Sequence, residues 1–315
     1  MPSNYSQAAL SSHETTGFTA DKAMFVAKSV DPSIVTAASW NTNGTDPAGN
    51  DDTDATTPAA RAYDGIGSPV TKLDSNTTST TYFNIDFTTF IAAFDVFGVI
   101  GHNFKTDGVS VLSLEISDTS NFTGSTAVEI FSKDVTALAS DTRFFCFNLN
   151  NAGGSTDAYS AGGTAQRYSD VRYLRVKLTT SGTIRPEIGE FFFGQRYQLS
   201  RNPNNPFDNK STSSSVSDFE SKSGAMRRYV MNKGRASRTI ALSTDDSTEI
   251  SEIDAFWSDC QFGTEPFLWV ETPSSAPLGY LVYAESTGLD FPLVGPTERA
   301  LTMRVIEQPA YLANE

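Results

Sequence analysis

Hydrophobic and polar residues alternate along several segments in the first two thirds of the chain. The alternation has a period of two in residues 82–87 (YFNIDF), 110–117 (SVLSLEIS) and 171–179 (VRYLRVKLT). This period is typical of β-strands with one buried face. In the third segment the better core face consists of Arg172, Leu174, Val176 and Leu178. The pattern therefore predicts strands in all three segments, with this face of the third turned inward.

Three other segments are apolar almost throughout, which predicts more deeply buried strands. They are residues 94–104 (FDVFGVIGHNF), 142–150 (TRFFCFNLN) and 188–199 (IGEFFFGQRYQL). In the last segment Phe191 and Phe193 fall on one face and Phe192 falls on the other. Both faces are then partly buried, or one of them meets a partner. Strands at this spacing, without a convincing amphipathic helix between them, predict a β-sandwich over residues 28–199.

The structure of the segments around these strands is predicted from their composition. Residues 1–27 are predicted to form an N-terminal extended arm, either frayed or lying on a neighbouring molecule. Residues 23–40 predict one or two short strands, interrupted at Asp31-Pro32. Residues 41–69 are rich in Asn, Asp, Gly, Thr and Pro, and residues 151–163 are rich in glycine. Both predict surface loops, the first long enough to carry a function.

After residue 199 the composition changes. Residues 200–225 contain Asn-Pro pairs and a run of serines, which predicts a linker or long loop. Strands are then expected in residues 226–231 and 238–243, with Asn232-Lys233-Gly234 as the turn between them. Further strands are expected in residues 266–271, 278–286 and 300–308.

One segment, about residues 247–261, has helical periodicity. Its apolar positions at helical spacing are Ile250, Ile253, Phe256 and Trp257. Asp245, Asp246 or Ser247 can cap its N-terminus, and Gly263 can end it. The predicted fold class is therefore mainly β. A jelly-roll β-sandwich is followed by a second β-rich (α+β) domain, residues 226–315, that carries this one helix.

Charge and cysteine content narrow the function classes. The 315-residue chain has a net charge of −14, which argues against nucleic acid as the main partner because phosphate binding needs clustered Lys and Arg. No apolar run approaches the ~18 residues of a membrane helix, so no membrane insertion is expected. Residues 1–10 lack the pattern of a signal peptide. Cys146 and Cys260 lie among apolar residues, which favours buried free thiols over a disulfide.

Several of these segments together resemble a known family. VFGVIGHNF (96–104), RYLRVKLTTSGTIRPEIGEFFFGQ (172–195) and YFNIDF (82–87) are similar to galactose-binding-like (discoidin-type) jelly-roll domains found in phage structural proteins. The second half, with Phe256-Trp257 on its helix and the PFLWV strand after it, resembles a tail-associated β-domain. Together the two resemblances cover about residues 28–310.

The resemblance implies a distal-tail or tail-tip protein of a long-tailed phage. Such a protein is a non-enzymatic structural component of the virion tail, made in the host cytoplasm. It would form a ring, a trimer or hexamer, with copies of itself and would contact other tail proteins. The alternative is a module that binds host-surface polysaccharide. A third reading, a polysaccharide-degrading enzyme, needs two positioned carboxylates, and the sequence nominates no pair.

Candidate site residues follow from the loops and from the two histidines. The acidic loop provides calcium candidates, Asp46, Asp51, Asp52, Asp54 and Asp64, because calcium takes six to eight oxygen ligands; no other cofactor is expected. Loop aromatics with nearby arginines provide sugar candidates: Tyr63, Tyr159 and Tyr168, with Arg61 and Arg167. His102 is predicted to be structural, closing the turn after Gly101 with Asn103, because no motif for a nucleophile or metal accompanies it.

One basic segment stands out in the acidic chain. Its charged residues are Arg227, Arg228, Lys233, Arg235 and Arg238. Contact with nucleic acid is one interpretation. The favoured interpretation is an ion-pair surface between copies of the chain, which suits a subunit with a net charge of −14.

Overall fold

The structure is a computed structural model. It describes residues 7–10, 23–28, 35–42, 52–56, 58–63, 71–74, 80–87, 94–117, 119–120, 122, 128–136, 144–148, 171–180, 182–199, 202–203, 211–220, 226–271, 278–285, 289, 292–295 and 297–307. Within these residues the chain is almost entirely β, and one helix is longer than a single turn. The predicted fold class is confirmed.

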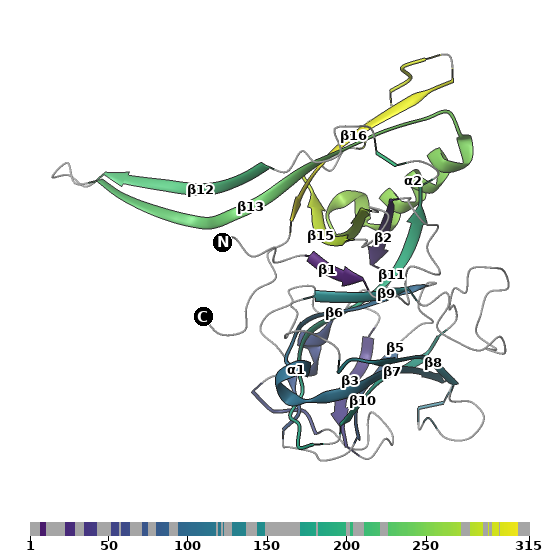
Figure 1. The fold of residues 1–315 in the computed structure, drawn as a ribbon, viewed down its shortest axis with the longest axis vertical. Coiled ribbons are helices and arrows are strands. Elements are labelled where there is room, and N and C mark those ends of the chain that lie inside the picture. The colour runs from purple at the N-terminus through teal and green to yellow at the C-terminus, as the bar shows by residue number, and fades with distance from the viewer. Residues whose placement is uncertain are drawn as a thin grey trace.

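The sandwich consists of two facing sheets in the lower half of Figure 1. The first is a five-stranded antiparallel sheet. Its order is β3 (Val35–Asn41), β5 (Thr80–Phe87), β10 (Tyr173–Thr180), β7 (Val109–Ser117) and β8 (Val128–Asp134). The second face is provided by β6 (Val96–His102) and β11 (Glu187–Gln198), with β4 (Thr71–Lys72) at the end of β11. Of these strands, β8 and β4 had no counterpart in the sequence prediction.

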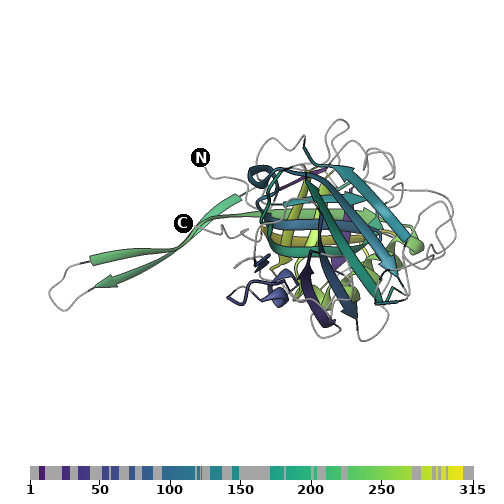
Figure 2. The ribbon, with the colours of Figure 1, turned by 90° about the horizontal axis from the view of Figure 1, so that it is seen from below.

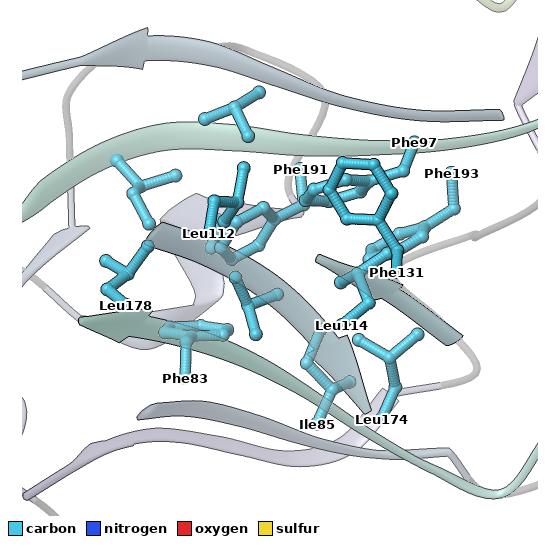
Figure 3. Close-up of a cluster of buried hydrophobic side chains, with 14 of the residues drawn as sticks. Phe83, Ile85, Phe97, Leu112, Leu114, Phe131, Leu174, Leu178, Phe191 and Phe193 are labelled. Atoms are coloured by element: carbon cyan, nitrogen blue, oxygen red, sulfur yellow. The ribbon is translucent and has the colours of Figure 1, made fainter. Parts of the chain in front are cut away.

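The sandwich core is rich in phenylalanine (Figure 3). The rings of Phe83 and Phe191 lie 5.2 Å apart across the two layers, and those of Phe97 and Phe131 lie 6.3 Å apart. On β10 the predicted core face is confirmed at three positions, because Leu174, Val176 and Leu178 are fully buried.

Arg172 was assigned to the same core face, and this was wrong. Its side chain is 39% exposed and pairs with Asp86, with Nε 3.0 Å from Oδ1. Arg172 lies just before β10 begins, where a guanidinium can reach the surface and need not be desolvated.

The second sheet continues beyond the sandwich into the C-terminal half. From β6 and β11 it runs through β2 (Met24–Lys28), β14 (Phe267–Glu271), β15 (Leu278–Ala284) and β16 (Arg299–Glu307) to β13 (Met226–Thr244) and β12 (Ser211–Glu220). On the other side of β6 lies β9 (Phe144–Asn148), and beyond it β1 (Gln7–Leu10). Strands from both predicted domains therefore share one sheet, and β2 lies between them.

Seven of these strands close into a barrel. Strand β1 pairs in parallel with β9 and also pairs antiparallel with β15, so the path β1-β9-β6-β11-β2-β14-β15 returns to its start. The register places one buried cluster on the inward face: Met24, Val26, Val96, Ile100, Phe192, Leu268, Val270 and Leu281. Lys28 and Glu190 lie on the same face and form a buried ion pair, with Nζ 2.5 Å from Oε1. Phe192 thus fills the barrel while Phe191 and Phe193 fill the sandwich, which confirms that β11 is buried on both faces.

The helix α2 (Ser247–Asp259) covers the outer face of the barrel strands. It begins where the sequence predicted: Asp246 is the N-cap, and its Oδ1 accepts the N–H of Thr248 at 2.8 Å. Phe256 stacks on Phe25 with ring centroids 4.5 Å apart, and Phe25 also contacts Trp269 at 4.8 Å. Residues 23–27, which the predicted division places in the N-terminal arm, are therefore a buried strand, at most 1% exposed, with a core on each side.

Two local predictions after residue 199 were wrong. The Ser-rich segment predicted as a linker contains β12, and β13 runs through Asn232-Lys233-Gly234 without a turn. At that point Ser213 pairs with Arg235 and Ser215 pairs with Asn232, so β13 carries an extra residue opposite β12. The Asn-Lys-Gly signal therefore marks a β-bulge, because a long partner strand continues on both sides of it.

Candidate functional site

One hairpin projects from the body of the molecule. It is formed by β12 and residues 226–237 of β13 and is here called the ribbon. Its two strands pair from Ser211 with Ser237 to Glu220 with Met226. From Ser237 onward β13 pairs with β16 instead. Two views at right angles show the ribbon leaving the body of the molecule (Figures 1 and 2). Among the described strands, β12 pairs only with β13.

A cluster at the root of the ribbon fixes it to the barrel. The Arg238 guanidinium lies 3.9 Å from the centroid of the Tyr280 ring, and its Nε donates to Oε1 of Glu307 at 3.3 Å. All three residues are at most 8% exposed. A buried guanidinium held between a carboxylate and an aromatic face is strongly constrained. The cluster therefore sets the direction in which β13 leaves the barrel.

The predicted sugar candidates are only partly described by the structure. Arg61 lies in the short 3-10 helix η3 (Ala59–Ala62), and Tyr63 follows it directly. Both side chains are half-buried, and Tyr63 packs against the sandwich core. Tyr159, Tyr168 and Arg167 lie outside the described residues. Both residues thus lie at η3, which packs against β3, β4 and β11 of the sandwich.

The predicted calcium candidates do not form a metal site in the described part of the chain. Asp52 accepts hydrogen bonds from the backbone and hydroxyl of Thr42. Asp54 accepts two from Thr56 and pairs with Arg185, with Oδ2 2.8 Å from Nη2. The hydrogen bonds from Thr56 lower the pKa of the Asp54 carboxyl. No group of three or more metal-ligating side chains occurs among the described residues, and Asp46, Asp51 and Asp64 lie outside them.

Arg185 connects the acidic loop to the rest of the sandwich. Arg185 donates through Nε to the carbonyl of Leu73, just after β4, while its carbonyl accepts from Asn103 Nδ2. Asn103 also accepts the N–H of Glu187 through Oδ1. The Asp54–Arg185 pair therefore ties the acidic loop to the turn after β6, and its role is to hold loops in place.

His102 is built into the same turn. It is 8% exposed, its Nδ1 accepts the N–H of Phe104 at 3.3 Å, and its ring lies 4.6 Å from that of Phe104. Gly101 before it has φ +62°, a conformation that glycine adopts without strain. These contacts agree with the structural role predicted for His102.

Cys260 is a buried free cysteine, as predicted. It lies directly after α2, and burial raises the pKa of its thiol to about 11. The thiol is therefore protonated at neutral pH and is a poor nucleophile. The side chain of Cys146 lies outside what the structure describes.

Sequence reasoning missed one polar cluster on the outer face of the five-stranded sheet. Arg175 donates through Nε to Oε2 of Glu115 at 2.7 Å, and Lys177 lies 3.3 Å from Oε1. The rings of Tyr82 and Phe122 lie 4.5 and 4.4 Å from the Arg175 guanidinium carbon. Period-two alternation did place Arg175 and Lys177 on one face, but Glu115 lies 60 residues away in the sequence. The cluster joins β10 and β7 through the one carboxylate of Glu115, which pairs with both cations.

Comparisons with known proteins give fold likenesses only. No protein-family model matches the chain, and no curated protein matches it in sequence. A GH29 fucosidase from Ruminococcus gnavus is similar over 51% of this chain and 26% of its own length, at 11% identity and a TM-score of 0.31. The CBM32-1 module of a family 31 glycoside hydrolase from Clostridium perfringens matches over 51% of this chain and 96% of its own, at 13% identity and TM-score 0.31.

A third similar structure is chitosan-binding module 1 from a chitosanase/glucanase of Paenibacillus sp. IK-5. It matches over 54% of this chain and 99% of its own, at 11% identity and TM-score 0.32. This chain spans only about a quarter of the fucosidase. None of these three structures is a phage protein, and none assigns a ligand or activity to this chain. No helix in the described part of the chain is long and apolar enough to cross a membrane.

Proposed function

We propose that this protein is a non-enzymatic structural subunit that assembles with copies of itself through the ribbon. The observation that carries the proposal is the ribbon's isolation from the body of the molecule. A two-stranded hairpin is at best marginally stable in water, and unpaired strand edges attract further strands. A ribbon in which nine residues of β12 pair with β13 therefore requires a second surface.

The arrangement of the rest of the chain suits this function. The barrel and α2 form a buried core that anchors β13, and the Arg238 cluster holds the ribbon at a fixed angle. The sandwich lies at the opposite end of the molecule from α2 and β16 (Figure 1), where it can be displayed. The finer assignment rests on the sequence resemblance: a ring of three or six copies in a phage tail, in contact with other tail proteins and located in the virion.

The test is the solution mass of the purified protein, measured by light scattering over a concentration series. The wild-type chain is expected to form one discrete oligomer. A variant with residues 211–236 replaced by a short Gly/Ser linker is expected to be monomeric while keeping its cooperative unfolding transition. The matched control inserts the same linker residues between Thr297 and Glu298, which are both exposed. A deletion variant that assembles like the wild type would overturn the proposal.

A second candidate function is saccharide binding by the sandwich. The observation that favours it is that Arg61 and Tyr63, both half-buried, lie in and directly after η3, which packs against β3, β4 and β11. Ligand-binding sites are commonly lined by aromatic side chains together with a few polar groups that orient the ligand. The carbohydrate-binding modules named above share the sandwich fold. Within this chain, the candidate saccharide site rests on Arg61 and Tyr63.

Binding to a glycan array and to bacterial surface polysaccharide would test this candidate. Arg61→Ala and Tyr63→Ala are each expected to lower binding by about tenfold or more. Tyr283→Ala, at a half-buried tyrosine on β15, is the control. Wild-type protein that binds no glycan, or binding that both variants leave unchanged, would contradict saccharide binding at this end.

A further inference from the structure

Strand β1 (Gln7–Leu10) closes the barrel by filling the space between β9 and β15, here called the slot (Figure 1). In the described part of the chain, no pairing joins β9 directly to β15. The pairing of β1 with β9 is parallel, whereas every other pairing between described strands is antiparallel. Without β1, one edge of β9 and residues 278–280 of β15 would present unpaired backbone groups, and such edges accept an added strand.

The sequence of β1 gives it little strand preference of its own. Its four residues, QAAL, include no β-branched or aromatic residue, and alanine is depleted in strands. Three of them pair with β15 and two pair with β9. The extended conformation of β1 therefore depends on backbone pairing in the slot. This pairing is the same whether the slot belongs to the same molecule or to an identical one.

The register of the sheet shows how far β1 lies from β2, the strand to which it is joined. Ala8 of β1 pairs with Gly279 of β15, which in turn pairs with Val270 of β14. Val270 pairs with Met24 of β2. Three steps of ~4.8 Å between neighbouring strands thus place Ala8 and Met24 about 14 Å apart along the sheet. Since all three pairings are antiparallel, the end of β1 and the start of β2 lie at the same end of the barrel.

The connection between β1 and β2 is longer than this span requires. It contains 12 residues, 11–22, and a fully extended chain covers at most ~3.5 Å per residue, or about 40 Å in all. The connection starts from a fixed point at Ala23, whose N–H donates to Asn202 Oδ1 at 2.9 Å and whose carbonyl accepts the N–H of Leu199 at 3.1 Å. Covalent geometry therefore lets β1 reach well beyond the slot of its own molecule.

We propose that, in the assembled protein, β1 of one molecule fills the slot between β9 and β15 of a second copy of this chain. The inference rests on the proposed function, in which copies of the chain assemble side by side, and it adds a contact to the one made by the ribbon. Exchange keeps every backbone pair of β1 and changes only the molecule that supplies the strand, which makes it a low-cost link between copies. Passed from each copy to the next, the exchange fills every slot in a closed ring.

Cysteine cross-linking identifies the molecule that supplies β1. The test variant carries Ala8→Cys and Gly279→Cys in a background of Cys146→Ala and Cys260→Ala. Directly paired residues on antiparallel strands have Cα atoms about 4.5–5.5 Å apart, which is within the range of a disulfide. The assembled protein is oxidised and separated on a denaturing gel without reductant. Most of it is expected to run as two or more linked chains, whereas a single monomer band would show that β1 fills its own slot.

The matched control is Ser113→Cys with Ser132→Cys in the same background. These serines pair on β7 and β8, with their Oγ atoms 3.0 Å apart. Their disulfide forms within one chain, so the control is expected to run as a monomer after the same oxidation. Ala9→Cys with Leu278→Cys is a second pair across the slot and replaces the first if Gly279→Cys does not fold.

A second experiment places the two cysteines on different chains. A chain with Ala8→Cys alone is co-expressed with a chain with Gly279→Cys alone, both in the background without native cysteines. Exchange is expected to give a covalent product that contains one chain of each kind, identified by a mass difference between two tags. Absence of this product, with the doubly substituted chain cross-linked as a monomer, would overturn the inference.

The outcomes separate this inference from the proposed function. If the wild-type chain forms a discrete oligomer but the slot cysteines link only within chains, or link in neither pair, the exchange of β1 is wrong and the proposed function stands. If linked chains persist after residues 211–236 are replaced by the Gly/Ser linker, the exchange is supported and assembly through the ribbon is wrong. If the wild-type chain is monomeric at every concentration, both proposals fail.

Discussion

The sandwich and the ribbon are built from the same secondary structure and differ in what stabilises them. In the sandwich, strands from two layers bury their side chains against one another, as Phe83 does against Phe191. In the ribbon, two strands pair only with each other among the described strands. The pairing within the ribbon shifts register at two points, and in the part of the chain that the structure describes no further strand lies over it (Figure 1). An isolated two-stranded hairpin is at best marginally stable in water, which supports the proposal that a partner covers the ribbon.

The largest test of this comparison is in the sandwich core. Phe191 is 1% exposed and lies 5.2 Å from Phe83 and 6.0 Å from Phe97. Phe191→Ala is expected to lower the free energy of unfolding by about 3–5 kcal/mol, because it removes a buried ring and leaves a cavity. Urea denaturation followed by fluorescence gives the value. Phe262→Ala, at an exposed position, is the control, and an equal loss in both variants would contradict the packing described for Phe191.

The next test concerns the strand shared by the sandwich and the barrel. A Cβ at Gly194 would lie 2.5 Å from Val26 Cγ1 and 2.9 Å from the carbonyl oxygen of Ala27. Gly194→Ala is therefore expected to destabilise the fold by about 1–3 kcal/mol through overpacking. At Gly182 the nearest atom to a new Cβ is 4.0 Å away, so Gly182→Ala is expected to have little effect. Thermal unfolding compares the two variants. A Gly194→Ala variant as stable as the wild type would show that β11 and β2 are not closely packed at this point.

A smaller effect is expected at the end of β13 opposite the ribbon. Asp246 caps α2 through its hydrogen bond to the Thr248 N–H. Asp246→Ala is expected to lower the free energy of unfolding by about 1 kcal/mol. Asp254→Ala, on the exposed face of the same helix, is the control for loss of charge. Chemical denaturation gives the free energy of unfolding of both variants. Equal losses in the two would contradict the capping role of Asp246.

The smallest effect at neutral pH is expected at Cys260. Because burial raises the pKa of its thiol from 9.0 to about 11, its stabilising contribution is complete below pH 9 and is lost as the pH rises through 11. Between pH 9 and 11, the free energy of unfolding of the wild type should therefore fall relative to that of Cys260→Ala. Denaturation in urea at pH 8, 9.5 and 11 measures it, and a constant difference would show that the thiol is not buried. Iodoacetamide should modify the native thiol much more slowly than the unfolded one at pH 8.

Much of the local structure could be predicted because it depends on neighbours in sequence. Alternation located β5, β7 and β10, and the FFF run showed that β11 is covered on both sides. The start of α2 followed from its cap and from the spacing of Ile253, Phe256 and Trp257. The candidate site was harder to predict. A Ser-rich segment with little apolar content gave no strand signal for β12, and Arg238 gave no sign of its contacts with Tyr280 and Glu307.

The sequence by itself determined many of the strands, where α2 begins and which faces of those elements are apolar, since each of these depends on side chains a few residues apart. Only the tertiary structure decided that β2 lies between β11 and β14, that β1 closes the barrel, and that β12 and β13 leave it as a ribbon. Those arrangements depend on partners far away in the chain, such as Arg238 and Glu307, 69 residues apart, or Ala23 and Asn202, 179 residues apart. Periodicity shows that a strand has a face to bury, but the partner that buries it is chosen by the packing of the whole chain.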